Sequence, residues 1–190
     1  MITGIILASG FSNRMGQNKL LIEVDGRRVI ERVIDSCKNS MLDEIILVYR
    51  VDELKEIGEK HGIKTIFNPN AHLGQSASVI QGVEDSKDLN AFMFIVGDQP
   101  FLDTKVIDKL IEEYRRDTKM IVTPYYNQKF GMPIIFPNIY KDDLLKVKGD
   151  KGGREIIENN KDLVKKIYFD NELLVIDIDT IEDLEKLNQK

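Results

Sequence analysis

The feature that most constrains the fold is a regular alternation of short apolar runs with segments whose apolar residues recur every three or four positions. The apolar runs are brief and rich in Ile, Val and Phe, which is typical of buried strands. They cover 2–7, 44–49, 63–67, 91–96 and 120–124. The helical patterns cover 28–38, 52–60, 76–85 and 103–116. Strand followed by helix, repeated along the chain, predicts an α/β fold in which a mostly parallel central sheet has helices on both faces.

The second half of the chain follows this alternation less closely. Further strands are expected at 131–136 and 173–178, and further helices at 139–147, 152–159 and 181–188. The sequence has no internal repeat, low-complexity tract or Ser/Pro-rich linker. Because 190 residues suit one hydrophobic core, we expect a single domain over 1–190 whose second half carries an insertion, roughly 125–170.

Charge and composition exclude several classes of partner. The 27 Lys and Arg residues are outnumbered by 32 Asp and Glu residues, for a net charge of −5. The chain therefore lacks the broad cationic field that binds nucleic acids or anionic membranes. Its apolar runs are far shorter than a membrane span, and its N-terminus lacks the pattern of an export signal. We expect a cytoplasmic protein with no nucleic acid and no membrane as partner, which holds any anionic ligand in a local site.

Cysteine and histidine are too few for two kinds of site. Cys37 is the only cysteine, which excludes an intramolecular disulfide, and together with His61 and His72 it cannot form a Cys/His zinc site. By residue type Cys37 is a possible nucleophile, but its apolar neighbours at helical spacing favour a buried core thiol.

The expected topology itself indicates where a ligand binds. In an open parallel sheet, ligands bind beyond the carboxyl ends of the strands, where the winding of the chain reverses. We therefore expect the site to lie in the loops after Leu7 and Val96 and near the late strand at Ile176.

The loop at 8–19 has the composition of a phosphate-binding loop. Gly10 and Gly16 allow backbone amides to approach a polyphosphate, and Arg14 and Lys19 add charge-assisted hydrogen bonds. Five residues separate the two glycines, so the loop is neither a Walker A sequence nor a GxGxxG fingerprint. The alternative is a surface connection whose glycines serve turns.

Carboxylates follow two of the expected strands. Asp98 lies in the GDQP segment at 97–100, where it suits a Mg²⁺ ion that bridges triphosphate oxygens; alternatively it forms a turn or caps a helix. Asp177 and Asp179 share one face of a strand, where they would repel each other without a cation or solvent. Asp179 also suits the cap of the last helix, a role compatible with metal binding.

The segment from Asn68 to Ser78 lies between an expected strand and the apolar face of an expected helix. Its serine hydroxyls and the helix N-terminus offer donors and acceptors that suit the edge of a small base. Ser76 is equally suited to be the N-cap of that helix.

Two further clusters combine glycine with basic residues, KFGMP at 129–133 and GDKGGR at 149–154. Lys151 and Arg154 enter a helix and are suited to hold an anionic acceptor. The alternative is that these charges are solvated loop residues.

The segment LASGFSNRMGQNK at 7–19 resembles the LAAGxSxRMGxxK signature of the MobA-like nucleotidyltransferases, especially the molybdenum cofactor cytidylyltransferase branch. Other segments resemble further motifs of that family: GDQP at 97–100, DIDTIEDL at 177–184, GQSAS at 74–78, KFGMP at 129–133 and GDKGGR at 149–154. The resemblance therefore covers nearly the whole chain. The sequence departs from the pattern at Ser9, where the cytidylyltransferase branch usually has Ala and the guanylyltransferase branch Gly, at Arg28 and at Ile181.

The resemblance implies a Rossmann-like nucleotidyltransferase fold and assigns the site residues by group. The implied catalytic residues are Arg14, Lys19 and Asp98. The implied nucleotide-binding residues are Leu7, Ala8, Ser9, Gly10, Gly74, Ser76 and Ser78. The implied acceptor-binding residues, in the insertion, are Gly131, Pro133, Lys151 and Arg154. Asp98, Asp179 and Asp177 would hold Mg²⁺.

The function expected on these grounds is transfer of CMP from CTP to molybdopterin, with release of pyrophosphate. An acceptor phosphate is already an anion near neutral pH, so the reaction requires no general base. The alternatives are a non-catalytic protein that delivers the cofactor to a molybdenum hydroxylase, and a transferase that uses GTP or a sugar-phosphate acceptor. The set Arg14, Lys19, Asp98 and Asp179 favours the enzyme, because a carrier has less need of a metal site.

Overall fold

A central sheet of eight strands organises the computed structural model, which describes residues 1–11, 18–87, 91–126 and 128–169. Its strands are β1 (Ile2–Ala8), β4 (Glu44–Tyr49), β5 (Lys64–Phe67), β6 (Ala91–Val96), β7 (Ile121–Tyr126), β8 (Lys129–Phe130), β9 (Ile134–Pro137) and β10 (Val164–Tyr168). They lie in the order β10-β7-β9-β6-β1-β4-β5, with β8 paired to β7. A separate two-stranded ribbon is formed by β2 (Glu23–Val24) and β3 (Arg27–Arg28).

The sheet is mostly parallel, as the sequence predicts. β6, β1, β4 and β5 pair in parallel, and so do β10 and β7. β8 and β9 are the exceptions, because β9 runs antiparallel between β6 and β7 and β8 pairs antiparallel with β7. Between β7 and β9 the chain turns back through β8, a connection too short for the helical crossover that a parallel strand requires.

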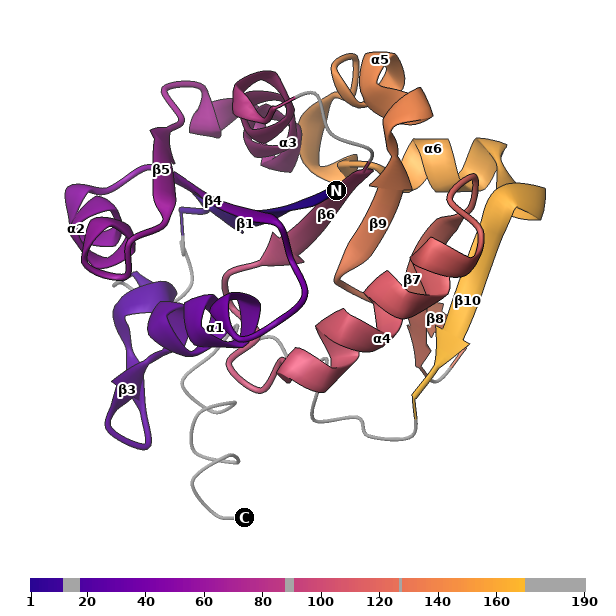
Figure 1. The fold of residues 1–190 in the computed structure, drawn as a ribbon. Helices are drawn as coiled ribbons and strands as arrows, with labels where there is room; N and C mark the ends of the chain where they lie inside the picture. The colour runs from indigo at the N-terminus through magenta and orange to yellow at the C-terminus, as the bar shows by residue number, and fades with distance from the viewer. Residues whose placement is uncertain (12–17, 88–90, 127, 170–190) are drawn as a thin grey trace.

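Helices cover both faces of the sheet (Figure 1). α1 (Val29–Lys38), α2 (Asp52–Lys60) and α4 (Thr104–Arg116) lie on one face, and α3 (Gln75–Asp85), α5 (Lys141–Leu144) and α6 (Arg154–Asn159) lie on the other. Single 3-10 turns occupy Lys19–Leu21, Ala71–Leu73, Asn138–Tyr140, Gly149–Lys151 and Lys161–Leu163. In the described part of the chain, no helix has the length and apolar character that crossing a lipid bilayer requires.

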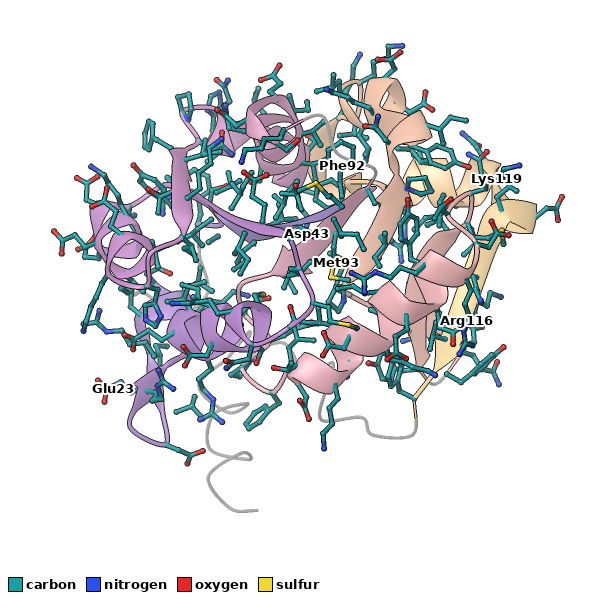
Figure 2. All side chains as sticks on the ribbon, in the orientation of Figure 1. Glu23, Asp43, Phe92, Met93, Arg116 and Lys119 are labelled. Carbon is teal, nitrogen blue, oxygen red and sulfur yellow. The ribbon has the colours of Figure 1, made fainter. Side chains whose placement is uncertain are left out.

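The core has two layers, one on each side of the sheet. Successive residues of β6 point to opposite faces, so that Phe92 packs into the layer under α3, α5 and α6 while Met93 packs into the layer under α1, α2 and α4 (Figure 2). Both side chains are fully buried. Cys37 of α1 is also buried, and burial raises the pKa of its thiol far above the ordinary range. The prediction of a core thiol is confirmed.

Several boundaries differ from the sequence prediction. The helix expected at 139–147 is a 3-10 turn followed by the single turn α5, and the helix expected at 152–159 begins at Arg154. β10 was not predicted, because two adjacent lysines, Lys165 and Lys166, interrupt its apolar pattern. An edge strand such as β10 tolerates this interruption. The strand expected at 173–178 and the helix at 181–188 lie outside the described residues.

Glu113 of α4 ties this helix to the edge strand β10. Its side chain is only 8% exposed, and its carboxylate lies 2.8 Å from Lys165 Nζ and 2.7 Å from Arg116 Nη1. The hydrogen bond from Lys165, helped by Lys109 and Arg116, lowers the pKa of Glu113 below its ordinary value of 4.5.

Glu113→Gln removes this charge at nearly constant volume, and we expect it to destabilise the protein at pH 7. Since the pKa of Glu113 is lowered by folding, its charge stabilises the native state above pH 4.5 and ceases to do so as the pH falls through the lowered pKa. The difference in urea midpoint between variant and wild type should therefore shrink in acid. Glu112→Gln, a change at an exposed neighbour, is the matched control. A difference that stays constant from pH 7 to pH 3 would contradict this assignment.

Candidate functional site

The winding of the sheet reverses between β1 and β6, and a cleft of about 700 Å³ opens at their carboxyl ends. Four segments far apart in the sequence line it. They are the residues that end and follow β1, those that end and follow β6, the turn that precedes α3 together with the start of α3, and the 3-10 turn at Gly149–Lys151. The lining includes Leu7, Ser9, Gly10, Phe11, Lys19, Leu20, Ala71, His72, Leu73, Gly74, Gln75, Ser78, Val96, Gly97, Asp98 and Asp150.

Lys19 and Asp98 meet inside this cleft. Lys19 Nζ lies 2.6 Å from Asp98 Oδ2, and both side chains are largely shielded from solvent, at 18% and 19% exposure. The turn that carries Lys19 is fixed by Asn18, whose side chain accepts a hydrogen bond from the Leu20 N–H at 3.1 Å, and by burial of Leu20. The two residues that the sequence places on separate loops therefore form one ion pair between β1 and β6.

Asp98 keeps a second carboxylate oxygen for another partner. Its Oδ1 is buried and makes no hydrogen bond in the part of the chain that the structure describes. A buried carboxylate oxygen without a partner is costly in a protein interior, and a divalent cation is a chemically suitable partner for it. The alternative that Asp98 caps a helix is wrong, because α4 begins at Thr104 and is capped by Asp103.

A buried polar cluster closes one side of the cleft. Ser9 Oγ and Ser78 Oγ lie 2.5 Å apart, and the Asn68 side-chain amide donates to both, at 3.1 and 3.2 Å. The Asn68 N–H donates to the Tyr49 carbonyl at the end of β4. The cluster thus joins the loop after β1 to α3 and to the strands beside it. The sequence analysis includes Asn68 in the segment from Asn68 to Ser78 but assigns it no role, although its position directly after a predicted strand was the available signal.

Gly74 brings the turn at Gly149–Lys151 against the start of α3. Its φ of +94° suits only glycine, and Asp150 Oδ1 accepts a hydrogen bond from the Gln75 N–H at 3.2 Å. A Cβ on Gly74 would overlap with Asp150 and with the backbone of Gly149. The predicted nucleotide-binding and acceptor-binding segments therefore touch each other.

The structure contradicts one of the two roles considered for Ser76. The N-cap of α3 is Gly74, so the alternative that Ser76 is that cap is wrong. Ser76 is buried and is not among the residues that line the cleft, whereas Gly74 and Ser78 are.

A second, larger cleft of about 1160 Å³ adjoins the first. The two share residues from the ends of β1 and β6, from the start of α3 and from the Gly149–Lys151 turn: Leu7, Gln75, Val96, Asp98 and Asp150. Gly131 and Arg154 line the larger cleft, and Pro133 does not. Asp98 therefore lies where the two clefts meet.

Of the remaining predicted residues, one has a described side chain and the others cannot be placed in the clefts. Ala8 is buried in β1 and does not line the smaller cleft. Arg14, Asp177 and Asp179 lie outside the described residues, and the side chain of Lys151 is not described either. Sequence reasoning also missed Phe11, which lines the smaller cleft and whose ring centroid lies 4.3 Å from the Arg50 guanidinium carbon.

Gly74→Ala tests the contact between the two segments. We expect it to lower the free energy of unfolding by about 2–4 kcal/mol, because it adds overlap with Asp150 to the strain of a positive φ. Gly62→Ala is the matched control, since Gly62 also has a positive φ but has open space around it, and it should cost only about 1–2 kcal/mol. Equal losses in urea denaturation would contradict the packing described here.

Residues 4–164, most of the chain, match the model of the MobA-like NTP transferase domain. A probable molybdenum cofactor guanylyltransferase of Natranaerobius thermophilus is 30% identical over 125 residues, which cover 65% of this chain and 60% of that protein. The chain thus spans less than two thirds of that relative.

Two solved structures share the fold over nearly their whole length. A nucleotidyl transferase of Methanothermobacter thermautotroptrophicus superposes with a TM-score of 0.86 at 19% identity, covering 100% of this chain and 96% of the other. A Mycobacterium tuberculosis protein solved in complex with manganese superposes with a TM-score of 0.82, also at 19% identity, covering 100% and 98%. These likenesses confirm the predicted Rossmann-like nucleotidyltransferase fold.

Proposed function

The chain belongs to the MobA-like NTP transferase family, and on this premise we propose that it transfers CMP from CTP to the phosphate of a molybdopterin-type acceptor and releases pyrophosphate. The observation that carries this proposal is the Lys19–Asp98 pair, which lies in a cleft between β1 and β6 and leaves one Asp98 oxygen without a partner among the described residues. The name of the guanylyltransferase relative supports the class of acceptor.

The smaller cleft suits a nucleoside triphosphate. Lys19 lines this cleft at the carboxyl end of β1, where its charge would offset phosphate charge that the negatively charged chain as a whole would repel. Gly10, exposed directly after the buried Ser9, presents its backbone without a side chain in the way. Arg14, on the same loop, would add a second cation.

Asp98 fits a Mg²⁺ ion. Lys19 compensates its Oδ2, so that Oδ1 is the oxygen for the metal, with Asp179 and Asp177 as further ligands. A metal bound there would supply Lewis-acid chemistry, polarising the α-phosphate and offsetting the charge of the triphosphate. The fold relative solved with manganese supports a divalent cation of this oxygen-seeking kind.

The two adjoining clefts suit an in-line attack between two anions. A phosphate oxygen of the acceptor attacks the α-phosphorus, the bond from that phosphorus to the bridging oxygen breaks, and pyrophosphate leaves with the electron pair. Catalysis then consists of positioning and charge neutralisation. Arg154, which lines the larger cleft, would hold the acceptor phosphate, and Lys19, which lines the smaller one, would stabilise the charge that develops on pyrophosphate.

Ser9 favours the smaller base. Its side chain is buried between Ser78 and Asn68 at the wall of the smaller cleft, where a glycine would leave additional room. A pyrimidine needs less of that room than a purine. We therefore favour CTP over GTP for this chain, although its named relative is a guanylyltransferase.

Ser9→Gly should shift the preference toward GTP. We expect the ratio of kcat/KM for CTP to that for GTP to fall by about tenfold. This is the usual change in substrate discrimination when one small group is removed from the wall of a binding pocket. Ser9→Ala keeps the Cβ and should keep the preference for CTP. Pyrophosphate release in the presence of Mg²⁺ and molybdopterin measures both ratios. An unchanged ratio in Ser9→Gly, or an equal shift in Ser9→Ala, would contradict this role.

Lys19→Met and Asp98→Asn test the proposed reaction itself. Each should lower kcat for pyrophosphate release about 100- to 1000-fold, the usual effect of removing one charge-stabilising group. Lys105→Met, at an exposed position of α4, should leave the rate unchanged. Wild-type protein that binds molybdopterin tightly but releases no pyrophosphate with either CTP or GTP would refute the enzyme and favour the carrier of the cofactor.

A further inference from the structure

The larger cleft has an apolar floor. Alternate residues of the chain that forms β8 and β9 point to the same face of the sheet and all line this cleft: Phe130, Met132, Ile134 and Phe136. Phe94, paired with Ile134 across β6 and β9, extends the floor. An apolar floor leaves the hydroxyl groups of a sugar without hydrogen-bond partners, which is costly, whereas it suits a flat conjugated ring.

Phe130 is the exposed end of that floor. Its ring is 43% exposed, the residue lines the cleft, and the ring packs edge to face on Tyr125 with 5.5 Å between ring centroids. Lys166 Nζ lies 4.7 Å from the Tyr125 centroid and 5.3 Å from the Phe130 centroid. Neighbours therefore hold the Phe130 ring in place while leaving part of it accessible, as a stacking surface requires.

Charged groups stand around the floor. Lys129 and Arg154 line the same cleft and suit the phosphate of an acceptor, while Glu158 suits ring N–H groups, since a carboxylate accepts hydrogen bonds. The cleft thus combines an aromatic surface with sites for an anion and for donor groups of a heterocycle.

We infer that Phe130 is the residue that selects the acceptor, by stacking on a planar heteroaromatic ring of the pterin class and disfavouring sugar phosphates. This inference rests on the proposed function, because it takes the larger cleft as the acceptor site. Tyr168 provides a matched comparison. It packs on the same Tyr125 ring at 5.3 Å and is 72% exposed, but it does not line the cleft.

Isothermal titration calorimetry of the full chain with pterin tests the inference without nucleotide turnover, and glucose 1-phosphate is the sugar-phosphate probe. Wild type should bind pterin more tightly than glucose 1-phosphate. Phe130→Ala should weaken pterin binding about tenfold, Phe130→Tyr should retain it, and Tyr168→Ala should change it less than twofold. Phe130→Leu, which keeps an apolar side chain without a planar face, provides a second variant if Phe130→Ala does not fold.

Each outcome of these titrations either supports or overturns the role assigned to Phe130. Equal binding of pterin to wild type and Phe130→Ala, equal losses in Phe130→Ala and Tyr168→Ala, or tighter binding of glucose 1-phosphate than of pterin overturns the inference. Pterin binding through Phe130 in a chain that releases no pyrophosphate would support the inference and refute the proposed reaction. Pyrophosphate release with pterin binding that is indifferent to Phe130 would do the reverse.

Discussion

The ion pair between Lys19 and Asp98 depends on one topological fact, that the sheet reverses its winding between β1 and β6. Because these strands are parallel neighbours, the loops that follow them leave the sheet at the same edge, and residues 79 positions apart reach one cleft. The pair also uses only one of the two carboxylate oxygens of Asp98. Lys19 neutralises one oxygen of Asp98, while the other is buried and has no hydrogen-bond partner among the described residues. In the function that we propose, this second oxygen binds the cation.

The antiparallel strand β9 gives the site its second half. It lies between β6 and β7, and its apolar residues form a floor beside the smaller cleft. The Gly149–Lys151 turn then packs on Gly74 at the start of α3, so that Asp150 borders both clefts. In the reaction that we propose, two anionic substrates would therefore be held by separate elements and meet at Asp98.

The sequence predicts the parallel half of the fold well, because there the spacing of the apolar residues matches the side chains that each strand or helix buries. The bounds of β4, α2 and β6 match the predicted 44–49, 52–60 and 91–96, since each of these segments has one consistent apolar pattern between clear breaks. It also places Lys19 and Asp98 at the correct edge. The Ser9–Asn68–Ser78 cluster and the Gly74–Asp150 contact could not be predicted, because they depend on how separate loops pack and not on local pattern. The direction of β9 could not be predicted either, because an apolar strand pattern is the same in both directions. The antiparallel direction follows from the short connection between β7 and β9.

The most direct measurement is a crystal structure with Mn²⁺ in place of Mg²⁺ and a non-hydrolysable CTP analogue, in which anomalous scattering locates the metal. The account predicts manganese on Asp98 Oδ1, with the triphosphate beside Lys19 in the cleft between β1 and β6. Manganese bound away from Asp98, or a nucleotide bound at another surface of the protein, would contradict it.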